Sequence, residues 1–78
     1  MSIKLNELYE TRDMLAESIN YDSYLLQCYE AKIKRVEPLS DVFEDTVNSI
    51  LDTRDRLKDF DRQQTENMLA IERETKKL

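Results

Sequence analysis

The single proline of this chain, Pro38, interrupts a sequence that contains no glycine. Proline restricts the residue before it to extended geometry, so a helix that approaches Glu37 should end at about Val36. Without glycine, the chain lacks the residue that most easily forms tight turns and phosphate-binding loops. The sequence therefore predicts two helical segments joined by one turn at about residues 37–39.

The charges at the ends of both segments have the signs that helix dipoles favour. Ser40 is a suitable N-cap for the second segment, and acidic residues follow it directly. Lys34 lies near the end of the first segment and Lys76 near the end of the second, where cations stabilise a helix. We therefore expect helices at about residues 3–36 and 40–77.

Apolar residues recur in both segments at the alternating three- and four-residue spacing of a coiled-coil seam. The stripe of the first segment is mostly apolar, and that of the second has more polar interruptions. The predicted seam of the first segment comprises Leu5, Leu8, Arg12, Leu15, Ile19, Asp22, Leu26, Tyr29, Ile33 and Val36. That of the second comprises Phe43, Val47, Ile50, Arg54, Leu57, Asp61, Gln64, Met68, Ile71, Thr75 and Leu78.

Folding the chain back at Pro38 places the polar interruptions of the two stripes at matching levels, with Asp22 opposite Arg54. A register shifted by one heptad would place Asp22 opposite Asp61. A buried polar group without a partner costs roughly 1–3 kcal/mol, so the first register is favoured. The same register predicts the pairs Leu5–Ile71, Leu8–Met68, Arg12–Gln64, Ile19–Leu57, Leu26–Ile50, Tyr29–Val47 and Ile33–Phe43.

The predicted fold is thus all-α: residues 1–78 form a single antiparallel two-helix hairpin that resembles a coiled coil. A swapped dimer, in which the same contacts are made between two chains, satisfies the same pattern. A chain of 78 residues buries only about 60% of its unfolded surface and is marginally stable alone. One cysteine and no histidine exclude an internal disulfide and a structural zinc site of the usual kind. We therefore expect dimerisation or a helical partner to complete the fold.

A second group of apolar residues lies outside the predicted seam, mainly in the half of the hairpin near the turn. A lone hairpin would leave these side chains in water. Tyrosine is common in interfaces because its ring tolerates partial hydration. The occupant is either a second copy, for instance in a four-helix bundle of two hairpins, or a different protein. The predicted protein interface comprises Met14, Tyr21, Tyr24, Leu25, Cys28, Val42 and Leu51.

Little in the sequence supports catalysis. The chain has no histidine to act as a general base or to activate Cys28, so we predict no catalytic residue, no cofactor and no metal site. Acidic and basic residues are interleaved around a net charge of −5, which disfavours nucleic-acid binding. No apolar run approaches the roughly 20 residues of a membrane span. The lone cysteine and the absence of a signal-peptide core favour a cytoplasmic location.

Two functions fit this pattern. The favoured one is a non-enzymatic protein–protein interaction module: a small helical subunit, adaptor or dedicated chaperone of a larger assembly, with no small-molecule substrate. The alternative is a small acidic regulatory inhibitor, of the kind carried by phages and mobile elements, that docks on a host enzyme or receptor and blocks it.

Overall fold

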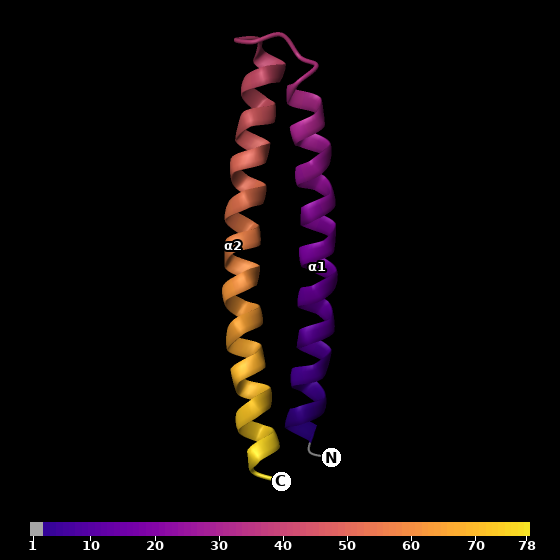
Figure 1. Cartoon of the computed structure of the whole chain (residues 1–78), viewed down its shortest axis with the longest axis vertical. Coiled ribbons are helices and arrows are strands. Elements are labelled where there is room, and N and C mark those ends of the chain that lie inside the picture. Colours follow the sequence, from indigo (N-terminus) through magenta and orange to yellow (C-terminus); the bar gives the residue numbers. More distant parts are fainter. Residues whose placement is uncertain (1–2) are drawn as a thin grey trace.

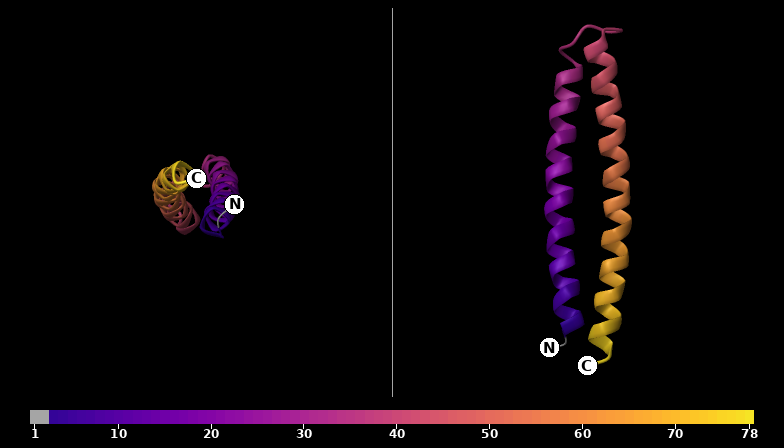
Figure 2. Two further views of the ribbon diagram at one scale, coloured as in Figure 1. Left: turned by 90° about the horizontal axis from the view of Figure 1, so that it is seen from below. Right: turned by 180° about the vertical axis from the view of Figure 1, so that it is seen from behind.

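The structure, a computed structural model, describes residues 3–78 and consists of two long antiparallel helices (Figure 1). Helix α1 spans Ile3–Ile33 and helix α2 spans Asp41–Lys76. The helices lie side by side along their whole length, and the views from below and from behind show no further layer (Figure 2). The resulting rod measures 58 × 15 × 13 Å. The predicted all-α antiparallel hairpin is confirmed.

The boundary of α1 differs from the prediction by about one turn. The helix ends at Ile33 rather than near Val36, and the backbone N–H of Arg35 donates to the carbonyl oxygen of Lys32 (2.9 Å) in a tighter turn. The chain must cross from one helix axis to the other, a separation of about 8–10 Å. In this structure the connection comprises residues 34–40 rather than the predicted 37–39, and the last predicted residues of the helix belong to it.

The start of α2 agrees with the sequence. Ser40 has extended backbone geometry, and its Oγ accepts a hydrogen bond from the backbone N–H of Phe43 (3.1 Å). Asp41 and Glu44 lie in the first turn, near the positive end of the helix dipole. This cap satisfies one of the N–H groups that a helix start leaves without an intrahelical partner.

The seam between the helices is only partly apolar. Leu5, Leu15 and Ile50 are its buried apolar side chains among residues 3–78. Four buried polar residues accompany them: Asp22, Thr46, Thr53 and Asn67. Other residues of the predicted seam of α1, such as Ile19 and Leu26, are half-buried. The interior of the hairpin therefore offers few fully desolvated apolar contacts.

The face that α2 turns toward α1 differs from the prediction. Arg54, Asp61 and Met68, which were expected in the seam, are exposed. The buried or half-buried positions lie one residue earlier in each heptad: Thr46, Thr53, Phe60 and Asn67.

The threonine side chains make this rotation of α2 possible at little cost. Thr53 Oγ1 donates to the carbonyl oxygen of Ser49, and Thr46 Oγ1 donates to that of Val42, both at 2.7 Å. Each hydroxyl is thus satisfied within its own helix, so the small side chain enters the seam at little cost. The guanidinium of Arg54 has no such local acceptor and remains at the edge.

The predicted register agrees with the structure despite this rotation. The side-chain amide of Asn67 donates from Nδ2 to the carbonyl oxygen of Leu8 (3.0 Å). Asn67 is adjacent to Met68, the predicted partner of Leu8, whereas a register shifted by one heptad would bring Thr75 to this level. Arg12 and Gln64 are opposite each other in this register, but no hydrogen bond joins their side chains. Arg12 is exposed, forms an ion pair with Asp13 (3.2 Å) and lies over the ring of Tyr9 (4.9 Å to its centre).

The buried amide of Asn67 leads to a first prediction. Its Oδ1 is buried and has no hydrogen-bond partner among residues 3–78. Asn67→Leu removes this unsatisfied acceptor and adds apolar contact, so we expect it to raise the free energy of unfolding by about 1–2 kcal/mol. Urea denaturation followed by circular dichroism measures the change. Asn48→Leu is the matched control, because Asn48 is exposed and the same replacement there should change stability by no more than about 0.5 kcal/mol.

The turn leads to a second prediction. Leu39 has a backbone φ of 67°, in the left-handed region, and its side chain is 96% exposed. This conformation costs a residue with a Cβ roughly 1–2 kcal/mol, part of which glycine recovers. We expect Leu39→Gly to stabilise the hairpin by about 0.5–1 kcal/mol in the same denaturation experiment. Leu39→Ala keeps the Cβ and should be nearly neutral, and an equal gain from both variants would contradict the strain explanation.

Candidate protein interface

An apolar stripe runs along one edge of α1, outside the seam. Met14, Tyr21 and Cys28 follow each other at heptad spacing, which places them on one side of a helix. Leu25 lies between them and the seam, and Tyr24 lies on their outer side. Met14, Tyr21 and Tyr24 are 62–64% exposed, Cys28 is exposed and Leu25 is half-buried. We call these five residues the α1 stripe.

The contacts between the helices show on which edge of the hairpin the α1 stripe lies. Leu25 follows Asp22 by one turn, and Asp22 binds Arg56 of α2. Val42 precedes Arg56 by two heptads and so lies on the same edge of α2. The structure therefore places Val42, which is 48% exposed, on the same side of the hairpin as the α1 stripe.

Leu51 of the predicted interface lies elsewhere. It precedes Arg54 by one turn, and Arg54 reaches Glu30 of α1 across the opposite edge of the hairpin (3.6 Å). Leu51 is half exposed, but it does not share a surface with the α1 stripe. The rotation of α2 is the reason, because it decides which edge each exposed residue of that helix joins.

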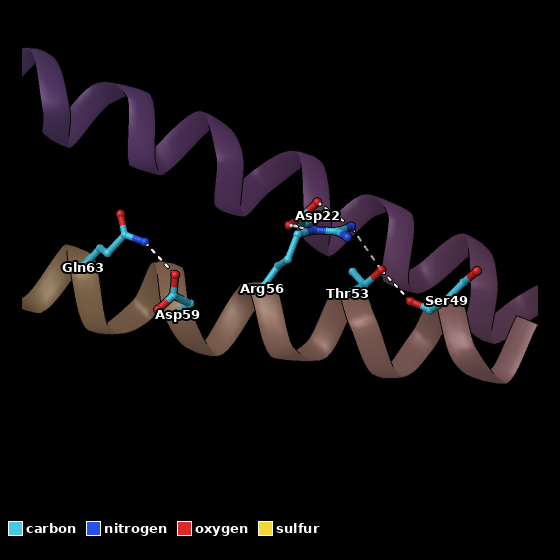
Figure 3. A network of polar contacts seen from close by, with 6 residues as sticks. All are labelled: Asp22, Ser49, Thr53, Arg56, Asp59 and Gln63. Atoms are coloured by element: carbon cyan, nitrogen blue, oxygen red, sulfur yellow. Dashed lines mark hydrogen bonds and ion pairs between the residues drawn. The ribbon is translucent and has the colours of Figure 1, made fainter.

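An ion pair between a buried carboxylate and a half-exposed arginine lies between the seam and the α1 stripe (Figure 3). The Asp22 carboxylate is almost fully buried and accepts hydrogen bonds from Arg56 Nε (3.1 Å) and Nη2 (3.4 Å). The same Nη2 lies 3.4 Å from Thr53 Oγ1, which in turn donates to the carbonyl oxygen of Ser49. The sequence predicted Arg54 as the partner of Asp22. The pairing with Arg56 corrects this, because Arg56 reaches inward from the edge while Thr53 occupies the seam.

The protonation of Arg56 is consistent with this ion pair. The hydrogen bond with Asp22 raises the pKa of Arg56, and the nearby carboxylate charges add to this effect. Arg56 therefore keeps its charge, as the buried carboxylate requires. Further along α2, Gln63 donates to Asp59 (2.8 Å) on the exposed surface (Figure 3). That second interaction stays within one helix and does not hold the hairpin together.

Two residues of the α1 stripe also interact with each other. Tyr24 and Cys28 lie one turn apart, and hydrogen bonding with the Cys28 thiol raises the pKa of Tyr24 above its ordinary value. A tyrosine phenol is already neutral at physiological pH, and the raised pKa of Tyr24 acts in the same direction. A neutral aromatic ring next to a thiol can be covered by an apolar partner without the cost of burying a charge.

Apolar exposure is not confined to the half of the hairpin near the turn. Met68 and Leu69, in the distal half of α2, are 61% and 50% exposed. Leu39 is the most exposed large apolar side chain, at the turn, where it borders a shallow hollow with Phe43 and Val47. Leu39 could not be predicted from the sequence, because one exposed leucine beside a proline has no periodicity to reveal it. These residues are scattered and form no stripe at heptad spacing.

Within residues 3–78, no cluster of histidine, cysteine or acidic side chains is arranged to hold a metal ion. Neither of the two helices, as far as the structure describes them, is long and apolar enough to cross a membrane. No protein-family model matches the chain, and neither a curated protein nor a solved structure shows significant similarity to it.

The ion pair beside the α1 stripe generates a third prediction. Asp22→Ala and Arg56→Ala should each destabilise the hairpin, and their combined effect should be smaller than the sum of the two, because each variant already removes the same interaction. Arg54→Ala is the control, and its effect should add to that of Asp22→Ala. Free energies of unfolding of the single and double variants test this. Coupling of Asp22 to Arg54 instead of Arg56 would contradict the observed pairing.

Proposed function

We propose that this protein is a non-enzymatic protein–protein interaction module, a small helical subunit, adaptor or dedicated chaperone that binds through the α1 stripe. One observation carries the proposal. The large apolar side chains Met14, Tyr21 and Tyr24 are more exposed than not on one helix of a hairpin whose own seam is half polar. Contiguous apolar surface of this kind marks interaction sites in soluble proteins.

Burial energetics support the same conclusion. Fully burying a large apolar side chain stabilises a protein by about 1.5–3 kcal/mol. In residues 3–78 the seam buries only Leu5, Leu15 and Ile50 to this extent. Covering the α1 stripe would desolvate a comparable number of large side chains. The hairpin therefore gains as much from a partner at this edge as from its fully buried apolar residues.

The mechanism we propose is helix packing. Side chains at heptad spacing on a straight helix insert between those of a facing helix or into an apolar groove. Methionine and tyrosine are enriched at such contacts, and the thiol of Cys28 is a small, polarizable neighbour for them. The charged residues around the stripe would remain in water and form the rim of the contact.

A second candidate function is docking on a basic surface of an enzyme or receptor as an inhibitor. A row of acidic residues at heptad spacing on α2 favours it: Asp45, Asp52, Asp59 and Glu66. Asp59 is already engaged with Arg62 (2.6 Å) and Gln63. The row therefore provides less free charge than its composition indicates, and we place this function second.

Substitutions in the α1 stripe test the proposed function. Tyr21→Asp or Met14→Asp should weaken binding by at least about tenfold, because a carboxylate in an apolar contact loses its hydration. Both positions are exposed, so circular dichroism should show unchanged helix content. Light scattering measures self-association, and capture from a lysate of the native host measures binding to other proteins.

The matched control makes the same chemical change away from the stripe. Leu69→Asp introduces a carboxylate at an exposed leucine on α2 and should leave binding unchanged. Equal loss in the Leu69 and Tyr21 variants would mean that added charge alone weakens binding, and the proposal would fail. Loss of binding in Asp45→Asn and Asp52→Asn, with normal binding in the stripe variants, would instead support the inhibitor function.

A further inference from the structure

We infer that the α1 stripe is covered by the α1 stripe of a second copy of this chain, packed antiparallel, with the two-fold axis beside Tyr21. This inference rests on the proposed function, since it requires the stripe to be a contact surface. It adds the identity of the partner, the direction of the partner helix and the register. Three features of the described residues lead to it.

The first feature is the symmetry about Tyr21 of the three heptad-spaced residues of the stripe; at the positions that mirror Leu25 and Tyr24 the chain has Glu17 and Ser18. Met14 lies one heptad before Tyr21 and Cys28 one heptad after it. In an antiparallel pair centred on Tyr21, Met14 of each copy lies level with the partner's Cys28, and the two Tyr21 rings meet at the axis. A two-fold contact requires such self-complementarity, because the same patch forms both sides of it.

The second feature is the distribution of charge at the two ends of the stripe. Glu7 and Glu10 precede Met14, whereas Lys32 and Arg35 follow Cys28, and all four are exposed. The antiparallel register brings Glu10 level with the partner's Lys32, and it places Glu7 toward the partner's Arg35, which lies just beyond the end of α1. A parallel pair would place each of these residues beside the same residue of the partner, with like charges together. Charge therefore favours the antiparallel pair and a second copy of this chain.

The third feature is that these four charges are not used within the hairpin. No ion pair of residues 3–78 includes Glu7, Glu10, Lys32 or Arg35, although Glu30 and Asp22 of the same helix are paired with arginines of α2. Helix dipoles also favour an antiparallel neighbour. Apart from Glu17, the centre of the stripe is mainly apolar and its ends carry complementary charges, which resembles an interface core and rim.

A disulfide experiment on the full chain tests the register. Cys28 is the only cysteine, and in the inferred dimer the two Cys28 residues lie 14 positions apart along the axis, about 21 Å. This far exceeds the separation of about 7 Å that a disulfide allows, so the oxidised wild type should remain uncrosslinked. Met14→Cys introduces a thiol level with the partner's Cys28 and should yield a covalent dimer on a non-reducing gel.

The same geometry supplies the controls. Within one chain, a cysteine at position 14 is also about 21 Å from Cys28, so an intramolecular bond cannot compete. Ala16→Cys introduces a thiol at nearly the same level, about 200° around the helix from Met14, and should not crosslink. A covalent dimer of the wild type would indicate a parallel pair, and equal crosslinking of Ala16→Cys would indicate random collision. Either result overturns the register.

A charge exchange tests the ends of the stripe independently. Glu10→Lys should weaken the dimer by about two- to fivefold at low salt, and adding Lys32→Glu should restore it, because the pair is reversed. In a parallel dimer the second change would bring no recovery. Sedimentation equilibrium at protein concentrations between about 10 μM and 1 mM covers the dissociation constants expected of a small interface formed by one helix of each copy.

The outcomes separate this inference from the proposed function. A monomer at all these concentrations, with Tyr21-dependent capture of another protein, overturns the second copy but retains the interaction module. A dimer that Tyr21→Asp does not weaken overturns both. A dimer weakened by Tyr21→Asp, crosslinked through Met14→Cys and restored by the charge exchange establishes the antiparallel pair.

Discussion

The carboxylate of Asp22 governs how the two helices face each other. It is buried in the seam and needs donors from α2, which Arg56 supplies through two nitrogens. Because Arg56 reaches inward from the edge, Thr53 faces the seam and Arg54 points away to Glu30. A buried charge without this partner would be strongly unfavourable, so the ion pair selects one rotation of α2 rather than adding much net stability. That rotation decides which residues of α2 are exposed and at which edge of the hairpin they lie.

The sequence was sufficient for the apolar seam of α1 and for the register, but not for the end of α1 or for the buried face of α2. In α1 one heptad column pair is clearly more apolar than the others, so the pattern indicates its buried face. In α2 two adjacent heptad columns have similar polarity, and hydropathy favours the column with Val47 and Met68. The hydroxyl of Thr53 is satisfied by its own backbone, which removes most of the cost of burying it. A hydropathy pattern does not show that a hydroxyl is hydrogen-bonded to its own helix backbone. The rotation of α2 could therefore not be predicted from the sequence.

An interface residue could be predicted from the sequence where its exposure does not depend on the rotation of α2. The α1 stripe lies well away from the seam of its own helix, so its exposure does not depend on how α2 is rotated. Leu51 does depend on that rotation, and it lies on the opposite edge. Leu39 was not predictable, because in a chain without glycine the left-handed position of the turn is occupied by a residue that gives no signal of it.

The polar seam and the apolar stripe have complementary roles. Buried polar groups such as Asp22 and Asn67 penalise other registers, but they provide less stabilisation than apolar residues of the same size would. Asn67 even leaves one acceptor unsatisfied. The hairpin thus has a well-defined pairing and a weak interior. The proposed contact through the α1 stripe would bind only the folded hairpin, because the unfolded chain has no continuous stripe. Binding would then stabilise the fold by mass action, so that association and folding support each other.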